Sequence, residues 1–348
     1  MTATLRLART TGSGVRDQRR LLAGLLVLGV VLVAVFLLSI TMGSRAITLG
    51  TVWDSLLRPG SGSVAQTVVR EIRVPRTLLG VLVGAALGLS GTILQGVTRN
   101  PLADPGIMGI NSGAAAAIVA SVMLFGAGGL STYVWFSFLG AGAAMLAVYS
   151  IASFGREGAT PVKLALAGAA VTAGLSSVTS TIVITHSDAL NELRMWQVGS
   201  LAGRYLPVFW QVLPFIAVGC AVALFSGRAL NGLALGEDIA VALGQHVVRT
   251  RLVMFATVAV LCGAATAACG PITFVGLVVP HLARLLCGPD YRWILAYAAV
   301  LTPVVLLGAD ILGRVVLANG ELQVGVVLGV LGAPVFIALV RSRNLVKL

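Results

Sequence analysis

The sequence predicts an all-α polytopic membrane protein with about ten transmembrane helices. Three observations carry this prediction. Hydrophobic residues make up 57% of the 348 residues and charged residues only 10%, whereas soluble domains carry about 25% charged residues. The apolar residues also gather in charge-free stretches of about 20 residues, the length that crosses the hydrocarbon core. A soluble enzyme, a disordered chain and a disulfide scaffold are therefore excluded.

The individual spans are predicted from stretches without Asp, Glu, Lys or Arg. Residues 1–20 are polar and basic and are expected to form a cytoplasmic tail, followed by a retained first span over residues 21–44. The later stretches are residues 77–98, 106–155, 164–185, 205–227, 252–283, 293–309 and 322–340. Residues 106–155 can form two helices with a turn near 126–129, and Gly270 and Pro271 divide 252–283, so the total is ten.

An even number of spans places both termini on one side of the membrane. With both termini in the cytoplasm, sixteen of the 24 Lys and Arg residues fall on the inner side, as the positive-inside rule requires. The expected organisation is a ten-span domain over residues 21–341, with its main inner loop at 228–251 and a cytoplasmic C-terminal tail at 342–348. The net charge of +12 then reflects inner loops rather than nucleic-acid binding, because no basic run is interleaved with aromatic residues. Arg70, Arg73 and Arg76 lie on the outer side against the rule, which indicates another role for them.

No motif for nucleotide binding or catalysis occurs in the sequence. It contains no G-x-x-x-x-G-K-[ST], no H-E-x-x-H and no G-x-S-x-G. An intramembrane hydrolase that pairs a serine with His186 or His281 is an alternative without motif support. Four cysteines are expected to be buried free thiols rather than metal ligands or disulfides: Cys220, Cys262, Cys269 and Cys287. We therefore expect a chain that is not an enzyme and that binds no cofactor or metal through its side chains.

The carboxylates bear on the energy source. Ionisable groups at mid-depth mark proton and ion relays, whereas here Asp310 and Glu321 are expected to flank spans. An ion-coupled secondary transporter that holds Na⁺ through backbone carbonyls stays open as an alternative. The simpler inference is that energy is supplied from outside the membrane.

Two inner features could receive that energy. Within residues 228–251, Gly236 precedes a possible short helix, Glu237 and Asp238 fall in its first turn, and Gly244 can end it. Such a helix could fit a groove on a partner, or the segment could be a solvated linker. The second feature is R-N-P-L-A-D-P-G at 99–106, whose two prolines cannot continue a helix and predict a compact turn that is either a connector or part of a gate.

Glycines at intervals of four are expected to bring helices close together. They are Gly80, Gly84 and Gly88 in the second span, and Gly325 and Gly329 in the last. Small residues at this spacing allow backbones to approach closely in lipid.

Seven segments together resemble the FecCD-type family, the membrane subunits of ABC importers for iron-siderophores and vitamin B12. In chain order they are R-V-P-R-T-L at 73–78, T-R-N-P-L-A-D-P-G-I-M-G-I-N at 98–111, E-L-R-M-W-Q-V-G-S-L at 192–201, the inner loop, G-P-I-T-F-V-G-L-V-V-P-H-L-A-R at 270–284, A-D-I-L-G-R at 309–314 and L-G-A-P-V at 331–335. Each segment alone is modest, but seven in the family's order are specific and extend over about residues 45–341.

The resemblance implies a BtuC-like type II ABC importer permease fold in the cytoplasmic (inner) membrane. It implies that ATP is used by separate cytoplasmic ABC ATPase subunits, and that a second permease, either a sister chain or a second copy, completes the path. An extracytoplasmic siderophore-binding protein would deliver the cargo. That cargo would be a ferric siderophore of the catecholate, enterobactin-like kind, with heme or cobalamin as alternatives.

The resemblance also assigns three groups of residues. Docking of the binding protein falls to Arg73, Arg76 and Arg314. The cytoplasmic gate falls to Asn100, Leu102 and Thr160. Contact with the ATPase falls to the coupling-loop residues Glu237, Ala242, Leu243 and Gly244.

Overall fold

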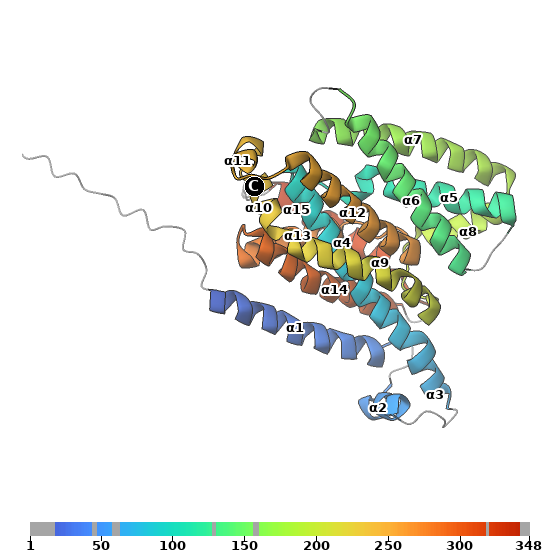
Figure 1. The fold of residues 1–348 in the computed structure, drawn as a ribbon. Helices are drawn as coiled ribbons and strands as arrows, with labels where there is room; N and C mark the ends of the chain where they lie inside the picture. Colours follow the sequence, from blue (N-terminus) through green and yellow to red (C-terminus); the bar gives the residue numbers. More distant parts are fainter. Residues whose placement is uncertain are drawn as a thin grey trace, which may run out of the picture.

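The computed structural model describes residues 18–43, 47–57, 63–126, 130–155, 160–317 and 320–341. Residues 1–17 of the expected N-terminal tail and the tail at 342–348 lie outside the described residues, as does most of the expected turn at 126–129. Within those ranges the regular structure is entirely helical (Figure 1). The helices are α1 (Gln18–Thr41), α2 (Leu49–Leu57), α3 (Val64–Thr67), the π-helix η1 (Val68–Arg73), α4 (Val74–Thr98), the 3-10 helix η2 (Pro105–Met108), α5 (Ile110–Phe125), α6 (Leu130–Ala152), α7 (Pro161–Thr185), α8 (Ser187–Gln197), α9 (Leu206–Phe225), α10 (Gly227–Ala234), α11 (Glu237–Ala242), α12 (Val247–Cys269), α13 (Val275–Cys287), α14 (Tyr291–Val315) and α15 (Val324–Arg341).

Ten of these helical segments account for the ten predicted spans. Seven segments in the described chain are long and apolar enough to cross a membrane: Gln18–Thr41, Val64–Thr98, Thr132–Ala152, Val162–Thr185, Leu206–Phe225, Val247–Cys269 and Tyr291–Val315. Three shorter apolar helices are Ile110–Phe125, Val275–Cys287 and Val324–Ala338. The expected break at Gly270 and Pro271 separates α12 from α13. The all-α, ten-span fold class is therefore confirmed.

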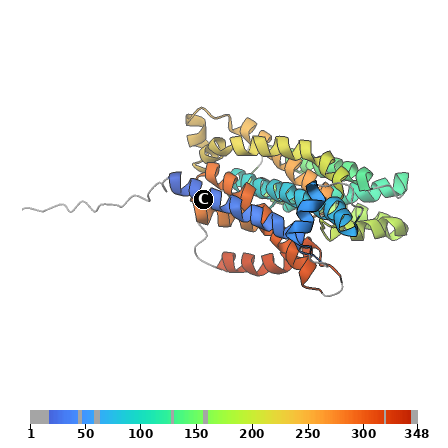
Figure 2. The same cartoon turned by 90° about the horizontal axis from the view of Figure 1, so that it is seen from below.

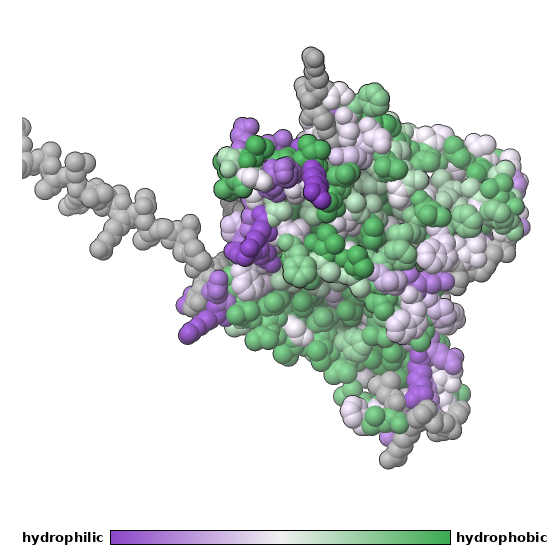
Figure 3. Space-filling model, in the orientation of Figure 1, coloured by the Kyte–Doolittle hydropathy of each residue, from purple (hydrophilic) through white to green (hydrophobic). Residues whose placement is uncertain are grey.

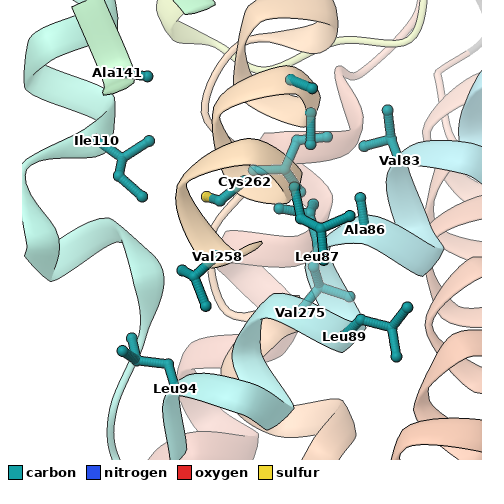
Figure 4. Packing of buried hydrophobic residues seen from close by; sticks show 14 of the residues in the cluster. Val83, Ala86, Leu87, Leu89, Leu94, Ile110, Ala141, Val258, Cys262 and Val275 are labelled. Carbon is teal, nitrogen blue, oxygen red and sulfur yellow. The ribbon is translucent and has the colours of Figure 1, made fainter. Parts of the chain in front are cut away.

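Helix α4 forms the centre of the molecule, with α9, α12, α13 and α14 packed around it (Figures 1 and 2). The helical segment that contains α4 is 78% buried over its most apolar window, whereas the corresponding window of α1 is only 6% buried. Figure 4 shows the core where Leu87 and Leu94 of α4 face Val258 of α12 and Ile110 of α5. A helix that is apolar all round yet exposed fits lipid contact, so α1 is a peripheral span.

Glycines set the distance between α4 and α14. A Cβ atom added at Gly84 would lie 2.7 Å from the Cα atom of Pro303, and one at Gly80 or Gly88 would also collide with α14. The predicted packing role of this series is thus confirmed. In α15, Gly325 abuts the backbone of Val198 and Gly199, just after the end of α8, and not another helix, and a Cβ atom at Gly329 would meet none of the described residues within 4 Å, so the predicted helix packing is not found there.

The structure corrects two boundaries drawn at charged residues. Asp310 was expected to flank its span, but it lies inside α14 and is fully buried. The second span was expected to start after Arg76, but its helical segment begins at Val64. Both errors have one cause. Each predicted span was ended at the first charged residue, but a charged side chain that forms an ion pair can lie within a membrane helix.

Candidate functional site

The main inner loop contains two short helices, α10 and α11, which we call the coupling element after the role that the family resemblance implies for it. Gly236 immediately precedes α11 with φ at 115°, and Gly244 follows it with φ at 80°, angles that glycine adopts without strain. Glu237 and Asp238 occupy its first turn, where acidic residues complement the helix dipole. The short helix predicted from the glycines and acids is therefore present.

Helix α11 presents an apolar surface at the end of the molecule that is expected to face the cytoplasm. Its Ala240 is buried against the body of the protein, but Ile239 and Val241 are 48% and 61% exposed. Of the expected ATPase contacts, Leu243 is 68% exposed, and Ala242 and Gly244 are also exposed. Figure 3 shows apolar side chains beside strongly hydrophilic ones at this end of the molecule. Exposed apolar side chains outside the spans are typical of a protein interface.

Glu237 connects the coupling element to two spans. Its Oε1 atom accepts a hydrogen bond of 2.6 Å from Nη2 of Arg251, on α12, and a weaker one of 3.5 Å from Nη2 of Arg99. Arg99 is the C-cap of α4 and has φ at 49°, in the left-handed region. One carboxylate therefore bridges α11, α12 and the inner end of the central helix.

A second connection ties α10 to the start of α14. Asn231 donates to Oδ1 of Asp290 at 2.7 Å and accepts from the backbone N–H of Tyr291 at 2.8 Å. Burial raises the pKa of Asp290, but hydrogen bonds from Arg292 and Asn231 outweigh it, so the pKa lies below its usual value. Asp290 also caps α14 by accepting from the N–H of Arg292. Two hydrogen bonds of Asn231 therefore join α10 to the first turn of α14.

The expected gate residues lie on two separate segments. Asn100 stabilises the turn after α4 by accepting, through Oδ1, from the backbone N–H of Leu102 at 2.9 Å. Leu102 is exposed. Thr160 caps α7 by accepting from the N–H of Lys163 at 3.3 Å. Within the described chain, no hydrogen bond joins Thr160 to the Asn100 turn.

The outer arginines form a buried charge cluster. Asp310 is flanked by Nη2 of Arg76 at 2.7 Å and Nη2 of Arg314 at 3.0 Å. Nη1 of Arg76 also binds Glu321 at 2.7 Å, and the Glu321 side chain is 36% exposed. Arg73, Arg76 and Arg314 are only 6%, 5% and 4% exposed. The three expected docking residues are therefore brought together, but their charges are directed into the protein.

Two of these arginines also hold the end of α1. Nη1 of Arg73 donates to the carbonyls of Ile40 and Thr41, and Nη1 of Arg314 donates to those of Ser39 and Met42. The last carbonyls of a helix have no partner within it, and cations at that end are favourable. Because α1 is otherwise peripheral, the cluster fastens its outer end to α4 and α14.

Sequence reasoning missed part of both sites. It did not include Asp310 in the cluster, although an Asp four residues before Arg314 on a helix is a recognisable pair. It also missed Ile239 and Val241 as surface residues. No local signal could have indicated the α1 carbonyls, because the bonds to them span more than 30 residues of chain.

These features have counterparts among known proteins. A model of the FecCD transport family matches residues 31–342. The chain belongs to the FecCD transport family.

Individual relatives of this FecCD chain cover nearly its whole length. It is 45% identical over 322 residues to the ferric enterobactin transport system permease protein FepD of Escherichia coli (strain K12), covering 92% of this chain and 95% of the relative. It is 36% identical to the hemin transport system permease protein HmuU of Yersinia pestis, covering 94% and 98%. Among solved structures, the inward-facing conformation of a metal-chelate type ABC transporter superimposes with a TM-score of 0.79 at 27% identity, covering 91% of this chain and 98% of that chain.

Membership of the FecCD family defines the general role of the protein. It is a multi-pass permease subunit of an ABC importer in the inner membrane. It is a transport component rather than an enzyme, and the ATP is used by an ATPase partner, without a cofactor bound to the permease. An importer of this kind also works with a binding protein outside the membrane.

Proposed function

We propose that this permease carries a ferric siderophore of the catecholate, enterobactin-like kind across the inner membrane. The observation that supports this cargo is the 45% identity to the ferric enterobactin permease over nearly the full chain. Identity is lower, at 40%, 37% and 36%, to relatives named for iron(3+)-hydroxamate, cobalamin and hemin. The alternative cargoes within the same family are heme and cobalamin.

Uptake by a deletion strain tests the cargo. Iron-starved cells that lack this chain are offered labelled ferric enterobactin, a labelled ferric hydroxamate, labelled hemin and labelled cobalamin. We expect only ferric enterobactin uptake to be lost and to return with the intact gene. Loss of hemin or cobalamin uptake instead would replace the proposed cargo with that compound.

The coupling element supplies the proposed mechanism. The exposed apolar residues of α11, together with Leu243 and Gly244, which follow them in the chain, enter a groove on the ATPase. Glu237 contacts the edge of that groove. When the ATPase subunits close on ATP, α11 moves. Its carboxylate passes the movement through Arg99 to the Asn100–Leu102 turn, which acts with Thr160 as the cytoplasmic gate. Asn231 passes the same movement to α14.

The proposed docking site for the binding protein is the outer cluster. Acidic side chains of the partner reach Arg76 by displacing Glu321, a partly exposed acid that binds Arg76 at the rim of the cluster, and they attract Arg73 and Arg314 beside it. Charge pairs of this kind set orientation and association rate. Docking therefore requires the partner to compete with internal bonds.

Substitution of the rim acid tests this docking site without emptying the buried cluster. Glu321→Gln should lower the Kd for the binding protein about twofold to fivefold at low salt, because a competing negative charge is removed. Asp188→Asn removes an exposed acid on α8 and serves as the matched control. Equal affinity of the Glu321→Gln and Asp188→Asn proteins would eliminate the cluster as the docking site.

A second permease completes the proposed assembly. The exposed face of α7 carries Leu166, Val178 and Ile184, an apolar surface suited to another permease or to lipid. We propose that a sister chain, rather than a second copy, covers it. Affinity purification of a tagged copy from cells that also express an untagged copy tests this: recovery of the untagged chain would favour the homodimer.

A further inference from the structure

A pocket with both polar and apolar lining residues opens between α5, α7 and α8, which lie together on one side of the fold (Figure 1). Its volume is about 390 Å³. The pocket-facing part of α7 is its C-terminal half, which supplies Ser176, Thr179, Ser180 and Val183. Polar lining residues include Asn111, Ser112, Ser176, Ser180, Trp196 and Gln197. Among the described residues, none that lines the pocket is charged.

Hydroxyl groups on α7 differ in their bonding. Thr179, which also lines the pocket, donates to the carbonyl of Leu175 in its own helix. Ser177 and Thr181 donate to the carbonyls of Ala173 and Ser177, four residues earlier in the helix. Ser176 and Ser180, which face the pocket, make no side-chain hydrogen bond within the described chain. Because positions 176 and 180 are one turn apart, the two free hydroxyls lie on one face of the helix.

Trp196 adds a donor from the opposite wall. The residue is only 6% exposed, and its indole N–H is buried without an acceptor in the described chain. A buried donor without a partner is costly and is rare in native proteins. The wall of this pocket therefore carries donors for which these parts of the chain supply no acceptor.

We propose that this pocket is a cargo-contact site that accepts one arm of an oxygen-rich chelate during transport, which rests on the function proposed above. Hydroxyl and indole donors match the acceptor oxygens of such an arm, and the Trp196 ring supplies an apolar wall for a planar group. A volume near 390 Å³ is at the lower end for small-ligand sites, about 300–1,000 Å³. The pocket therefore holds part of a bulky chelate and not the whole.

Neutral donors suit transport better than ion pairs would. A site on a transport path must bind its cargo weakly enough to release it. With no charge in its lining, the pocket discriminates by the positions of acceptor atoms rather than by net charge. The pocket would thus discriminate between chelates at a second stage, after the binding protein has delivered them to the permease.

Paired substitutions on α7 test the site. Ser176→Ala with Ser180→Ala removes the two free hydroxyls, and Ser177→Ala with Thr181→Ala removes two that are bonded to their own helix. Uptake kinetics are measured for ferric enterobactin and for a ferric hydroxamate. We expect the first pair to reduce Vmax/KM for the better transported chelate about fivefold to thirtyfold, the effect of losing two neutral hydrogen bonds. The second pair should stay within about twofold of the unaltered protein.

Trp196→Phe gives an independent measurement, since it removes the N–H and keeps most of the ring. It should change the ratio of Vmax/KM between the two chelates and leave the Kd for the binding protein unchanged. The site is disproved if both Trp196→Phe and the pocket-facing serine pair match the control pair. If the serine pair does not reach the membrane, Trp196→Phe decides. If the unaltered protein transports the hydroxamate but not ferric enterobactin, the catecholate proposal fails while the pocket is still tested with the hydroxamate.

Discussion

The outer arginine cluster and the inner coupling element both contain charged residues, but these residues are buried in the cluster and exposed in the coupling element. In the cluster, three arginines are nearly fully buried around Asp310 and the end of α1. In the coupling element, charged pairs around Glu237 are exposed, and apolar side chains of α11 face outward. The difference indicates that charge holds the outer face together internally, whereas the inner face is arranged to bind another protein.

The largest effect on stability is expected from removing the buried carboxylate of the cluster. Asp310→Ala leaves Arg76 and Arg314 without their shared counter-ion, and we expect it to lower the free energy of unfolding by about 3–5 kcal/mol. Thermal unfolding of the purified protein in detergent measures the loss. Glu321→Gln removes a half-exposed partner of the same Arg76 and should cost less than about 1 kcal/mol. Equal melting temperatures for the two variants would show that the cluster is not structural.

The inner face should respond in the reverse way. Ile239→Asp with Leu243→Asp places charges in the exposed apolar surface, so thermal stability should hardly change while affinity for the ATPase falls about tenfold or more. Copurification with the ATPase and a binding titration measure this. Leu57→Asp, at an exposed apolar residue of α2 on the outer side, is the control and should bind the ATPase normally. A marked loss of stability in the double variant would contradict the comparison.

A smaller effect is expected from the bridge to the central helix. Glu237→Gln removes the ion pairs with Arg99 and Arg251, which are exposed pairs worth at most about 1 kcal/mol. We expect ATP-driven uptake to fall about twofold to fivefold because transmission to α4 is weakened, while the Kd for the ATPase, which Glu237 contacts only at the edge of the groove, rises less than about fivefold. Asp238→Asn is the matched control, since its carboxylate makes no ion pair within the described residues. Uptake that is equally reduced in both variants would assign the effect to charge at the helix start instead.

The smallest effect concerns pH at the junction of α10 and α14. Because the pKa of Asp290 is lowered in the folded state, its stabilising contribution is present above the unfolded value of about 3.9 and is lost as the pH falls through the lower folded value. Thermal unfolding of the unaltered protein and of Asp290→Asn should therefore differ at neutral pH, and the difference should begin to shrink near pH 4 and vanish below the folded pKa. A difference that persists in acid would mean that Asp290 acts through shape rather than charge.

Local patterns predicted the coupling element well and the cluster poorly. Gly236, Glu237 and Gly244 lie within nine residues, so their backbone and dipole preferences act on one short helix. The cluster joins Arg76 to Asp310, which is 234 positions away, and no pattern in the sequence gives the direction of a side chain. Arg73, Arg76 and Arg314 could be grouped from the family resemblance, but their burial could not.

The sequence by itself determined the ten spans and the short coupling helix, because hydrophobic length and glycine positions are local or compositional properties, and its Lys/Arg asymmetry predicts their orientation. Only the tertiary structure decided that Asp310 belongs inside α14, that the outer arginines hold α1, and that Ser176, Ser180 and Trp196 surround one pocket. These features depend on which helices pack side by side. Within lipid, that choice is made by close backbone contacts and buried polar pairs between distant segments.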